Sequence, residues 1–192
     1  MAVERAQEVI DTMAEERARL IEWVRSVPQE TWSNLSPDGM WQARDYVAHL
    51  ASIDPLLTAL MRIFQSGGEI GRGSDGRPFS IDDWNEKQIL ERRVRPMEEL
   101  IADMEKYRVD LNAALAGFTD EQLDRTFHFG GDKSRSPRDL PVAQFLTGLA
   151  YHDRWHMEDA RRAIAGEPEQ PFGDEAFERM LQGRAGSSGA AR

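Results

Sequence analysis

Two of the four histidines in this 192-residue chain stand four positions apart, at His152 and His156. Side chains at that spacing lie one above the other on the same face of a helix, so two imidazoles can reach one ion. His49 lies next to Leu50 and one turn before Ile53, near the apolar face of an earlier segment. Because bundle metal sites are built from inward residues on facing helices, these three histidines are the candidate ligands.

The alternative interpretation of this pattern is structural. A histidine on an apolar face is more often a hydrogen-bonded core residue than a ligand, and the HxxxH spacing is common. Burial of two uncompensated imidazoles is costly, however, which favours a metal. The chain has no cysteine, so disulfides, thiolate ligands and a thiol nucleophile are excluded. Any metal must therefore be held by His, Asp or Glu.

Other polar residues near the histidines have two interpretations each. Asp45 is one turn before His49 and Asp159 is one turn after His156, so either carboxylate could orient a ligand imidazole. An ordinary solvated helix charge explains each of them equally well. His128 lies in an expected loop beside phenylalanines and is interpreted as solvated or locally bonded.

The segment beginning at His152 also resembles the HExxH motif of metalloproteases. Asp153 replaces the glutamate base and is one methylene shorter, and no third histidine follows downstream. These departures argue against a protease.

Three tryptophans could wall a pocket, although an aromatic residue at helical spacing is more often part of the core: Trp41, Trp84 and Trp155.

Four apolar stripes with steps of three and four residues predict the elements that carry these groups. The expected helices lie near residues 3–27, 41–65, 96–117 and 140–165. Pro55 lies inside the second stripe and predicts a kink or break there. Ser80 with Asp83 resembles a capping box that begins a further helical segment. The longer connections are expected at 66–79 and 118–138, with a small hairpin starting at 126–131.

Such narrow stripes can be buried only against one another, which predicts an all-α fold. The simplest arrangement is an antiparallel up-down-up-down four-helix bundle with long loops. We expect residues 1–170 to form this metal-binding bundle. Residues 171–192 are expected to add a short helix near 174–180 and a disordered tail.

The overall composition limits the partners of the chain. A net charge of −10 argues against nucleic acid and against an anionic membrane surface. No run of apolar residues approaches the ~18 needed to cross a bilayer. The N-terminal segment carries acids where a signal peptide is basic and then apolar, so a cytoplasmic location is expected.

Two motifs resemble a known family. The segment 45–50, Asp-Tyr-Val-Ala-His-Leu, with Trp41 before it, resembles the second-helix motif of the DinB/YfiT-like metalloproteins. The segment 152–160 resembles their fourth-helix motif, and the order and spacing of the helices extend the resemblance over roughly 5–165. The resemblance implies a four-helix bundle whose three histidines hold a divalent ion, commonly zinc or nickel. It also implies a low-molecular-weight thiol, such as mycothiol or bacillithiol, and often a homodimer.

Three neutral nitrogens would leave the ion fully dipositive, which suits zinc or nickel, with cobalt or iron as alternatives. At least one coordination position would stay open, as in catalytic sites. The first hypothesis is therefore a metal-dependent transferase or isomerase that uses a thiol on a small electrophile. The alternatives are a metal-dependent hydrolase and a non-enzymatic metal-binding stress protein. A basic patch would favour an anionic thiol over a hydrolase substrate. The candidates for such a patch are Arg44, Arg72 and Arg77, although these residues are more often simply solubilising charges.

Overall fold

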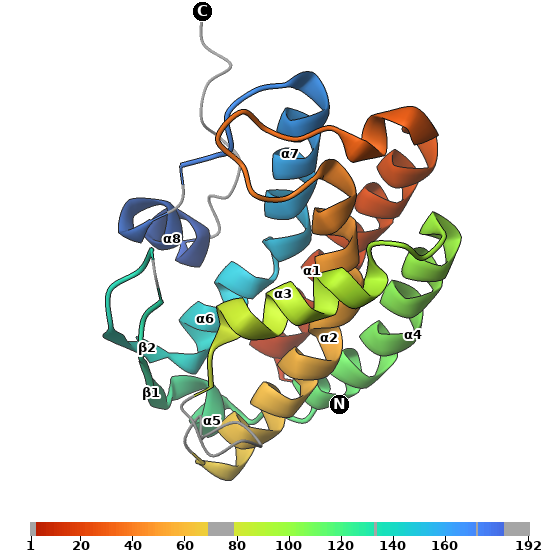
Figure 1. The fold of residues 1–192 in the computed structure, drawn as a ribbon. Helices are drawn as coiled ribbons and strands as arrows, with labels where there is room; N and C mark the ends of the chain where they lie inside the picture. The colour runs from red at the N-terminus through yellow and green to blue at the C-terminus, as the bar shows by residue number, and fades with distance from the viewer. Residues whose placement is uncertain (1–2, 69–78, 133, 172, 183–192) are drawn as a thin grey trace, which may run out of the picture.

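The computed structural model describes residues 3–68, 79–132, 134–171 and 173–182. Its bundle consists of α1 (Glu4–Ser26), α2 (Ala43–Ser66), α4 (Met97–Ala116) and a fourth column formed by α6 (Val142–Leu149) and α7 (His152–Ala165) (Figure 1). The predicted four-helix bundle with long loops is confirmed. The connections hold the shorter elements η1 (Gln29–Ser33), α3 (Ile81–Arg92), α5 (Asp120–Asp124), β1 (Thr126–Phe129), β2 (Arg138–Pro141) and α8 (Asp174–Leu181).

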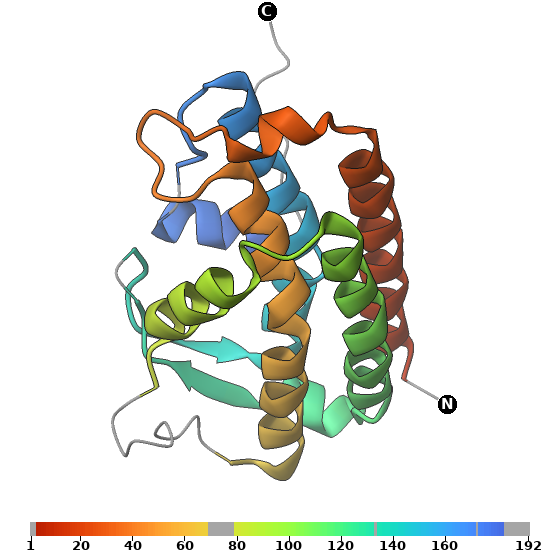
Figure 2. The same cartoon turned by 45° about the vertical axis from the view of Figure 1, so that its right-hand side comes forward.

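The order of helix directions differs from the simple up-down-up-down arrangement. Near the start of both helices Arg44 of α2 donates to the Arg95 carbonyl before α4, and near both ends Gln65 donates to the Ala114 carbonyl. Helices α2 and α4 are therefore parallel, because α3 carries the chain back along the bundle between them (Figures 1 and 2). The amphipathic stripes do not encode this reversal, since a stripe faces the core in either direction.

The fourth column is not one continuous helix. Helix α6 ends at Leu149, and α7 begins at His152 after a turn at Ala150 and Tyr151. The expected single helix over 140–165 is corrected accordingly. As a result His152 stands at the first position of α7, and its neighbour Asp153 lies in the first turn.

Helix α2 is continuous from Ala43 to Ser66, so Pro55 does not break it, which was one of the two outcomes predicted there. It ends at Gly67, which has a φ of +70°, a conformation that glycine adopts at no steric cost. By length and composition α2 would be long and apolar enough to span a membrane, but 67% of that stretch is buried within the fold. It packs against α3, α4 and α7, which accounts for its apolar character.

The predicted hairpin at 126–129 is confirmed, and its second strand pairs antiparallel from Phe129↔Arg138 to Thr126↔Pro141. Helix α8, predicted near 174–180, packs on this hairpin and on α6. Its Phe177 is fully buried. A Cβ at Gly148 would lie 3.1 Å from the Leu181 side chain, so the glycine permits this close approach. The expected tail at 183–192 lies outside the described residues.

A layer of buried charge divides the core of the bundle into two apolar clusters. One cluster contains Leu20, Leu50 and Met104, and the other contains Met13, Leu57 and Leu111. Between them lie four charged side chains, each at most 9% exposed, one from each column of the bundle: Arg17, Asp54, Arg108 and Asp153.

This four-residue ionic layer is closely bonded. Arg17 donates from Nε and Nη2 to the two Asp153 oxygens at 2.6 and 3.0 Å. Arg108 donates from Nε to Asp54 at 2.8 Å and from Nη2 to Asp153 at 3.3 Å. Two positive and two negative groups balance, as buried charges require. The layer explains why Arg17 interrupts an otherwise apolar stripe, and it fixes Asp153 beside His152.

Candidate metal centre

The start of α2 is fixed by Asp45, four residues before His49. One Asp45 oxygen accepts the Gln42 backbone N–H at 2.9 Å, and Arg93 donates to both oxygens at 2.8 and 2.9 Å. Asp45 is completely buried and is fully used by these bonds. It therefore anchors the start of α2 and the end of α3. None of these bonds involves His49, so they do not support the hypothesis that Asp45 orients that ring.

The three predicted histidines meet between α2 and α7. The Nε2 atoms of His49 and His152 are 3.4 Å apart, and each of the three rings offers a nitrogen within 4.8 Å of the others. The ring centroids of His156 lie 4.7 Å from His49 and 4.6 Å from His152. Among the described residues, the His, Asp and Glu side chains that converge closely enough to hold a metal ion are these three histidines. The group contains no carboxylate.

These distances fit one ion. Two nitrogens that each lie about 2.05 Å from a tetrahedral zinc ion are about 3.3 Å apart. The 3.4 Å between the Nε2 atoms of His49 and His152 agrees with that separation. If both imidazoles are neutral, at most one of the two facing nitrogens can carry a hydrogen and donate it to the other. A metal ion would instead accept the lone pairs of both nitrogens.

Burial and mutual repulsion keep two of the imidazoles neutral. Desolvation lowers the pKa of His49 well below 6.5, and the nearby His156 lowers it further. Desolvation is also the main cause that lowers the pKa of His152 well below 6.5, followed by the other two histidines. A metal ligand must be deprotonated, so this environment prepares both rings for an ion.

Asp159 lies beside His156 without a formed hydrogen bond, since the buried Nδ1 of His156 has no hydrogen-bond partner within the described residues. Its Oδ2 lies 3.5 Å from Nδ1 of His156. Its Oδ1 accepts from the side chain of Gln170 at 3.0 Å, so the carboxylate is held in place. With Nδ1 turned toward Asp159, His156 has its Nε2 left for the cluster.

Aromatic rings form one wall of the histidine cluster. The Trp41 ring lies 5.4 Å from His49 and 6.3 Å from His156, and the Tyr46 ring lies 5.9 Å from His156. The buried Tyr46 hydroxyl donates to Glu169, and burial with this bond raises the Tyr46 pKa. Of the three tryptophans considered, Trp41 packs on the histidines. Trp84 packs in the apolar cluster around Met61 and Trp155 packs on Ala176.

The remaining candidates lie elsewhere. His128 is 68% exposed and its Nδ1 bonds to Asp139 at 2.9 Å, as the interpretation of a locally bonded histidine predicts. Arg44 donates to the Arg95 carbonyl, a neutral acceptor, so it keeps its positive charge and is directed toward the start of α4. Arg72 and Arg77 fall outside the described residues. Asp153 stands where a protease would have its base, but its carboxylate is bound by Arg17 and Arg108.

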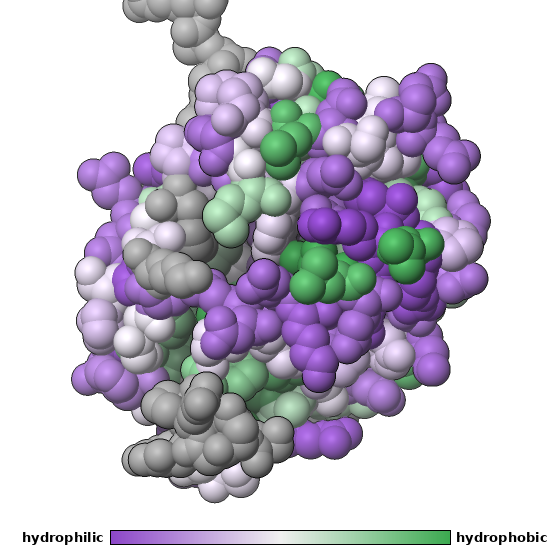
Figure 3. Space-filling model, viewed as in Figure 1, coloured by the Kyte–Doolittle hydropathy of each residue, from purple (hydrophilic) through white to green (hydrophobic). Residues whose placement is uncertain are grey.

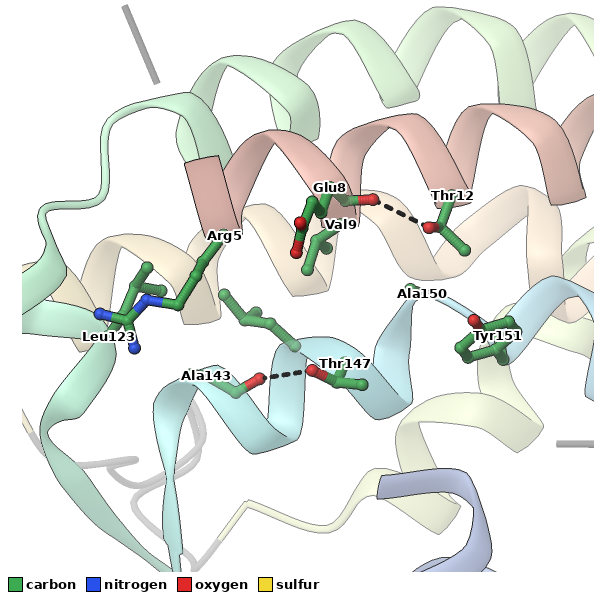
Figure 4. A pocket seen from close by; sticks show the side chains of 10 residues that line it. Arg5, Glu8, Val9, Thr12, Leu123, Ala143, Thr147, Ala150 and Tyr151 are labelled. Carbon is green, nitrogen blue, oxygen red and sulfur yellow. Dashed lines mark hydrogen bonds between the residues drawn. The ribbon is translucent and has the colours of Figure 1, made fainter. Parts of the chain in front are cut away.

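A cavity of about 280 Å³ lies between α1 and α6, away from the histidines. Figure 4 shows lining side chains from both helices, among them Arg5 and Val9 of α1 and Thr147 of α6. Figure 3 shows a largely hydrophilic face with separate hydrophobic patches rather than one continuous apolar surface. The histidine cluster reaches the surface at His152 and His156, which are both partly exposed, whereas His49 is buried.

A helical bundle with three convergent histidines defines a recognisable class of protein. The family model of the DinB superfamily matches residues 7–160, which is most of the chain. The chain therefore belongs to the DinB superfamily, and the resemblance of its two motifs is confirmed. No curated protein matches the sequence.

Solved structures share the fold at low sequence identity. The mycothiol-dependent maleylpyruvate isomerase has a TM-score of 0.60 and 14% identity, over 96% of this chain and 91% of that one. A variant of the isomerase also has a TM-score of 0.60 and 14% identity. The alignment covers 81% of this chain and 60% of that chain. YfiT from Bacillus subtilis, described as a probable metal-dependent hydrolase with an unusual four-helix bundle topology, has a TM-score of 0.60, 19% identity and coverage of 86% and 90%.

The lowered histidine pKa values predict how the metal-free protein responds to acid. The unfolded chain binds protons on its histidines near pH 6.5, whereas folded His49 and His152 remain neutral. Stability should therefore fall as pH drops below about 6.5, by up to about 1.4 kcal/mol per pH unit for each buried histidine. Asp153, whose pKa is far below normal because Arg17 and Arg108 stabilise its charge against desolvation, would add a loss only below about pH 4.

Urea denaturation of the metal-free protein between pH 7.5 and 5 measures this slope. The His128→Ala variant should keep the same dependence, because that histidine is exposed. A urea midpoint that does not change over this range would contradict the burial of neutral imidazoles.

Proposed function

We propose that His49, His152 and His156 bind one divalent metal ion, with zinc or nickel as the preferred ions. The observation that carries the proposal is the convergence of three imidazole nitrogens, with 3.4 Å between two of them. The neutral state of His49 and His152 and the position of Asp159 beside His156 support it. Three ligands would leave a coordination position for a substrate, as in catalytic zinc sites.

We further propose a metal-dependent transferase or isomerase that uses a low-molecular-weight thiol, such as mycothiol or bacillithiol, on a small electrophile. When bound, a dipositive ion here would lower the pKa of a coordinated thiol or water and supply a nucleophile at neutral pH. Support comes from the shared fold of the mycothiol-dependent isomerase over nearly the whole of both chains. The absence of cysteine from this chain fits a thiol supplied by a cosubstrate.

The chain's own residues would shape this site. The rings of Trp41 and Tyr46 would cover one side of the histidines and exclude water from it. Tyr46 keeps its proton because burial and its bond to Glu169 raise its pKa, so it serves as a fixed wall rather than as a base. Asp159 would hold His156 by its second nitrogen.

The shared fold of YfiT supports a second candidate, a metal-dependent hydrolase with activated water as the nucleophile. A non-enzymatic metal-binding stress protein is the third. Arg44 keeps its charge while it donates to the Arg95 carbonyl, but no contact among the described residues places it at the histidines, so it does not favour the first candidate over the second. The cytoplasmic location, the homodimer and the domain boundary at residue 170 stay predictions.

Cobalt substitution would distinguish these candidates. A low-molecular-weight thiol at millimolar concentration is expected to change the d–d absorption of the cobalt-loaded protein, since sulfur would enter the open position. A thioether of the same size, which cannot ionise, is the matched control. With cobalt content confirmed, an unchanged spectrum would exclude the thiol-dependent reaction and leave the hydrolase or the binding protein.

A further inference from the structure

The two nitrogens of His49 face different surroundings. Its Nε2 lies 3.4 Å from Nε2 of His152 and belongs to the proposed metal site. Its Nδ1 lies on the other side of the ring, is buried, and has no hydrogen-bond partner within the described residues. A buried polar atom left without a partner costs roughly 1–3 kcal/mol, so such atoms call for an explanation.

A complementary atom is available on α3. Oδ1 of Asn85 is also buried and also lacks a partner within the described residues. The Asn85 side chain interacts with the His49 ring, and it stabilises the protonated imidazole, as an accepting oxygen does. The buried Nδ1 of His49 could donate and the buried Oδ1 of Asn85 can accept, and neither atom has another partner within the described residues.

We propose that Asn85 is a positioning residue for His49. Its Oδ1 accepts a hydrogen bond from Nδ1–H, which fixes the tautomer whose Nε2 lone pair points at the ion. Histidine ligands generally donate their second N–H to such an acceptor, which sets the ring orientation. The inference rests on the proposed metal site, and it adds a residue from a helix that contributes no ligand.

The structure explains how α3 can hold Asn85 in place. The helix begins at an N-cap where Ser80 Oγ accepts the Asp83 backbone N–H at 3.2 Å. At its other end, Arg93 is bonded to the buried Asp45 of α2. The segment that carries the chain back between α2 and α4 (Figure 2) is thus capped at its start and bonded to α2 at its end, and residue 85 lies between these two points in the sequence.

Two substitutions at this position separate hydrogen bonding from packing. Asn85→Ala removes the acceptor and is expected to lower zinc affinity about tenfold or more, the usual effect of losing such a partner. Asn85→Asp keeps an acceptor of the same shape and should restore an affinity at least equal to that of the unchanged protein. Asn112→Ala is the matched control, because Asn112 on α4 also has a buried, unpartnered Oδ1. It should leave zinc affinity unchanged.

Nitrogen-15 NMR of the imidazoles gives a readout that does not depend on activity. In the unchanged protein and in Asn85→Asp, His49 should be protonated at Nδ1, with a slowly exchanging proton. In Asn85→Ala that proton should exchange rapidly or the tautomers should mix. A wild-type tautomer in Asn85→Ala, or a loss of zinc affinity that Asn85→Asp does not reverse, would overturn the proposal.

The same measurements keep this inference distinct from the metal site itself. If the unchanged protein binds no zinc, the proposed function fails, and the tautomer of metal-free His49 still tests the contact with Asn85. If zinc binds normally and the tautomer is independent of residue 85, the metal site stands and the role of Asn85 is refuted.

Discussion

Alanine at any one of His49, His152 or His156 is expected to lower zinc affinity by at least about a hundredfold. Zinc sites with four ligands bind with about 10–16 kcal/mol, so one ligand contributes roughly 3 kcal/mol or about two orders of magnitude. The loss should be similar at the three positions, because their nitrogens lie within 4.8 Å of one another. Competition with a chromogenic chelator would measure the affinity.

His128→Ala is the control for this series, since His128 is exposed and pairs with Asp139 on the hairpin. It should bind zinc as the unchanged protein does. Melting temperatures of the metal-free variants would show that they remain folded, because the apolar clusters do not depend on the ion. An alanine variant that retained full affinity would remove that histidine from the site.

The second large effect is expected in the ionic layer, which the metal proposal does not require. Arg108→Met should lower the free energy of unfolding by about 3–5 kcal/mol, because it leaves the buried Asp54 and Asp153 with Arg17 alone. Arg25→Met on α1 is the matched control, since its ion pair with Glu98 is exposed, and it should cost less than about 1 kcal/mol. Urea denaturation followed by circular dichroism would measure both.

A double variant tests the physical cause. If the cost comes from an unbalanced buried charge, then Arg108→Met combined with Asp54→Leu should recover part of the lost stability. The two residues are in direct contact, so their effects should not be additive. Additive losses would show that packing, rather than charge balance, explains the effect of Arg108→Met.

Periodicity in the sequence was sufficient to predict three long helices, the position of the fourth column and the convergence of the histidines. His152 and His156 share the inner face of one helix because they are four residues apart. Stop signals such as Gly67 and Gly166 have positive φ and end α2 and α7 near the expected residues. These features depend on local chain geometry, which a single sequence contains.

Other features depend on contacts that periodicity does not record. The parallel pairing of α2 with α4 follows from the path of α3, and the turn before His152 interrupts a pattern that reads as continuous. The pairing of Asp153 with Arg17 joins residues 136 positions apart. Arg17 as a charged residue in an apolar stripe was the available signal for the ionic layer. Asn85 gave no signal, because one amide on a polar helix has no distinctive spacing.

Anomalous diffraction at the zinc edge, from crystals of the zinc-loaded protein, tests the central claim most directly. The account predicts one strong peak between α2 and α7, about 2.0–2.1 Å from one nitrogen of each of His49, His152 and His156. Absence of a peak at that point, with zinc bound elsewhere or not at all, would contradict the proposed metal centre.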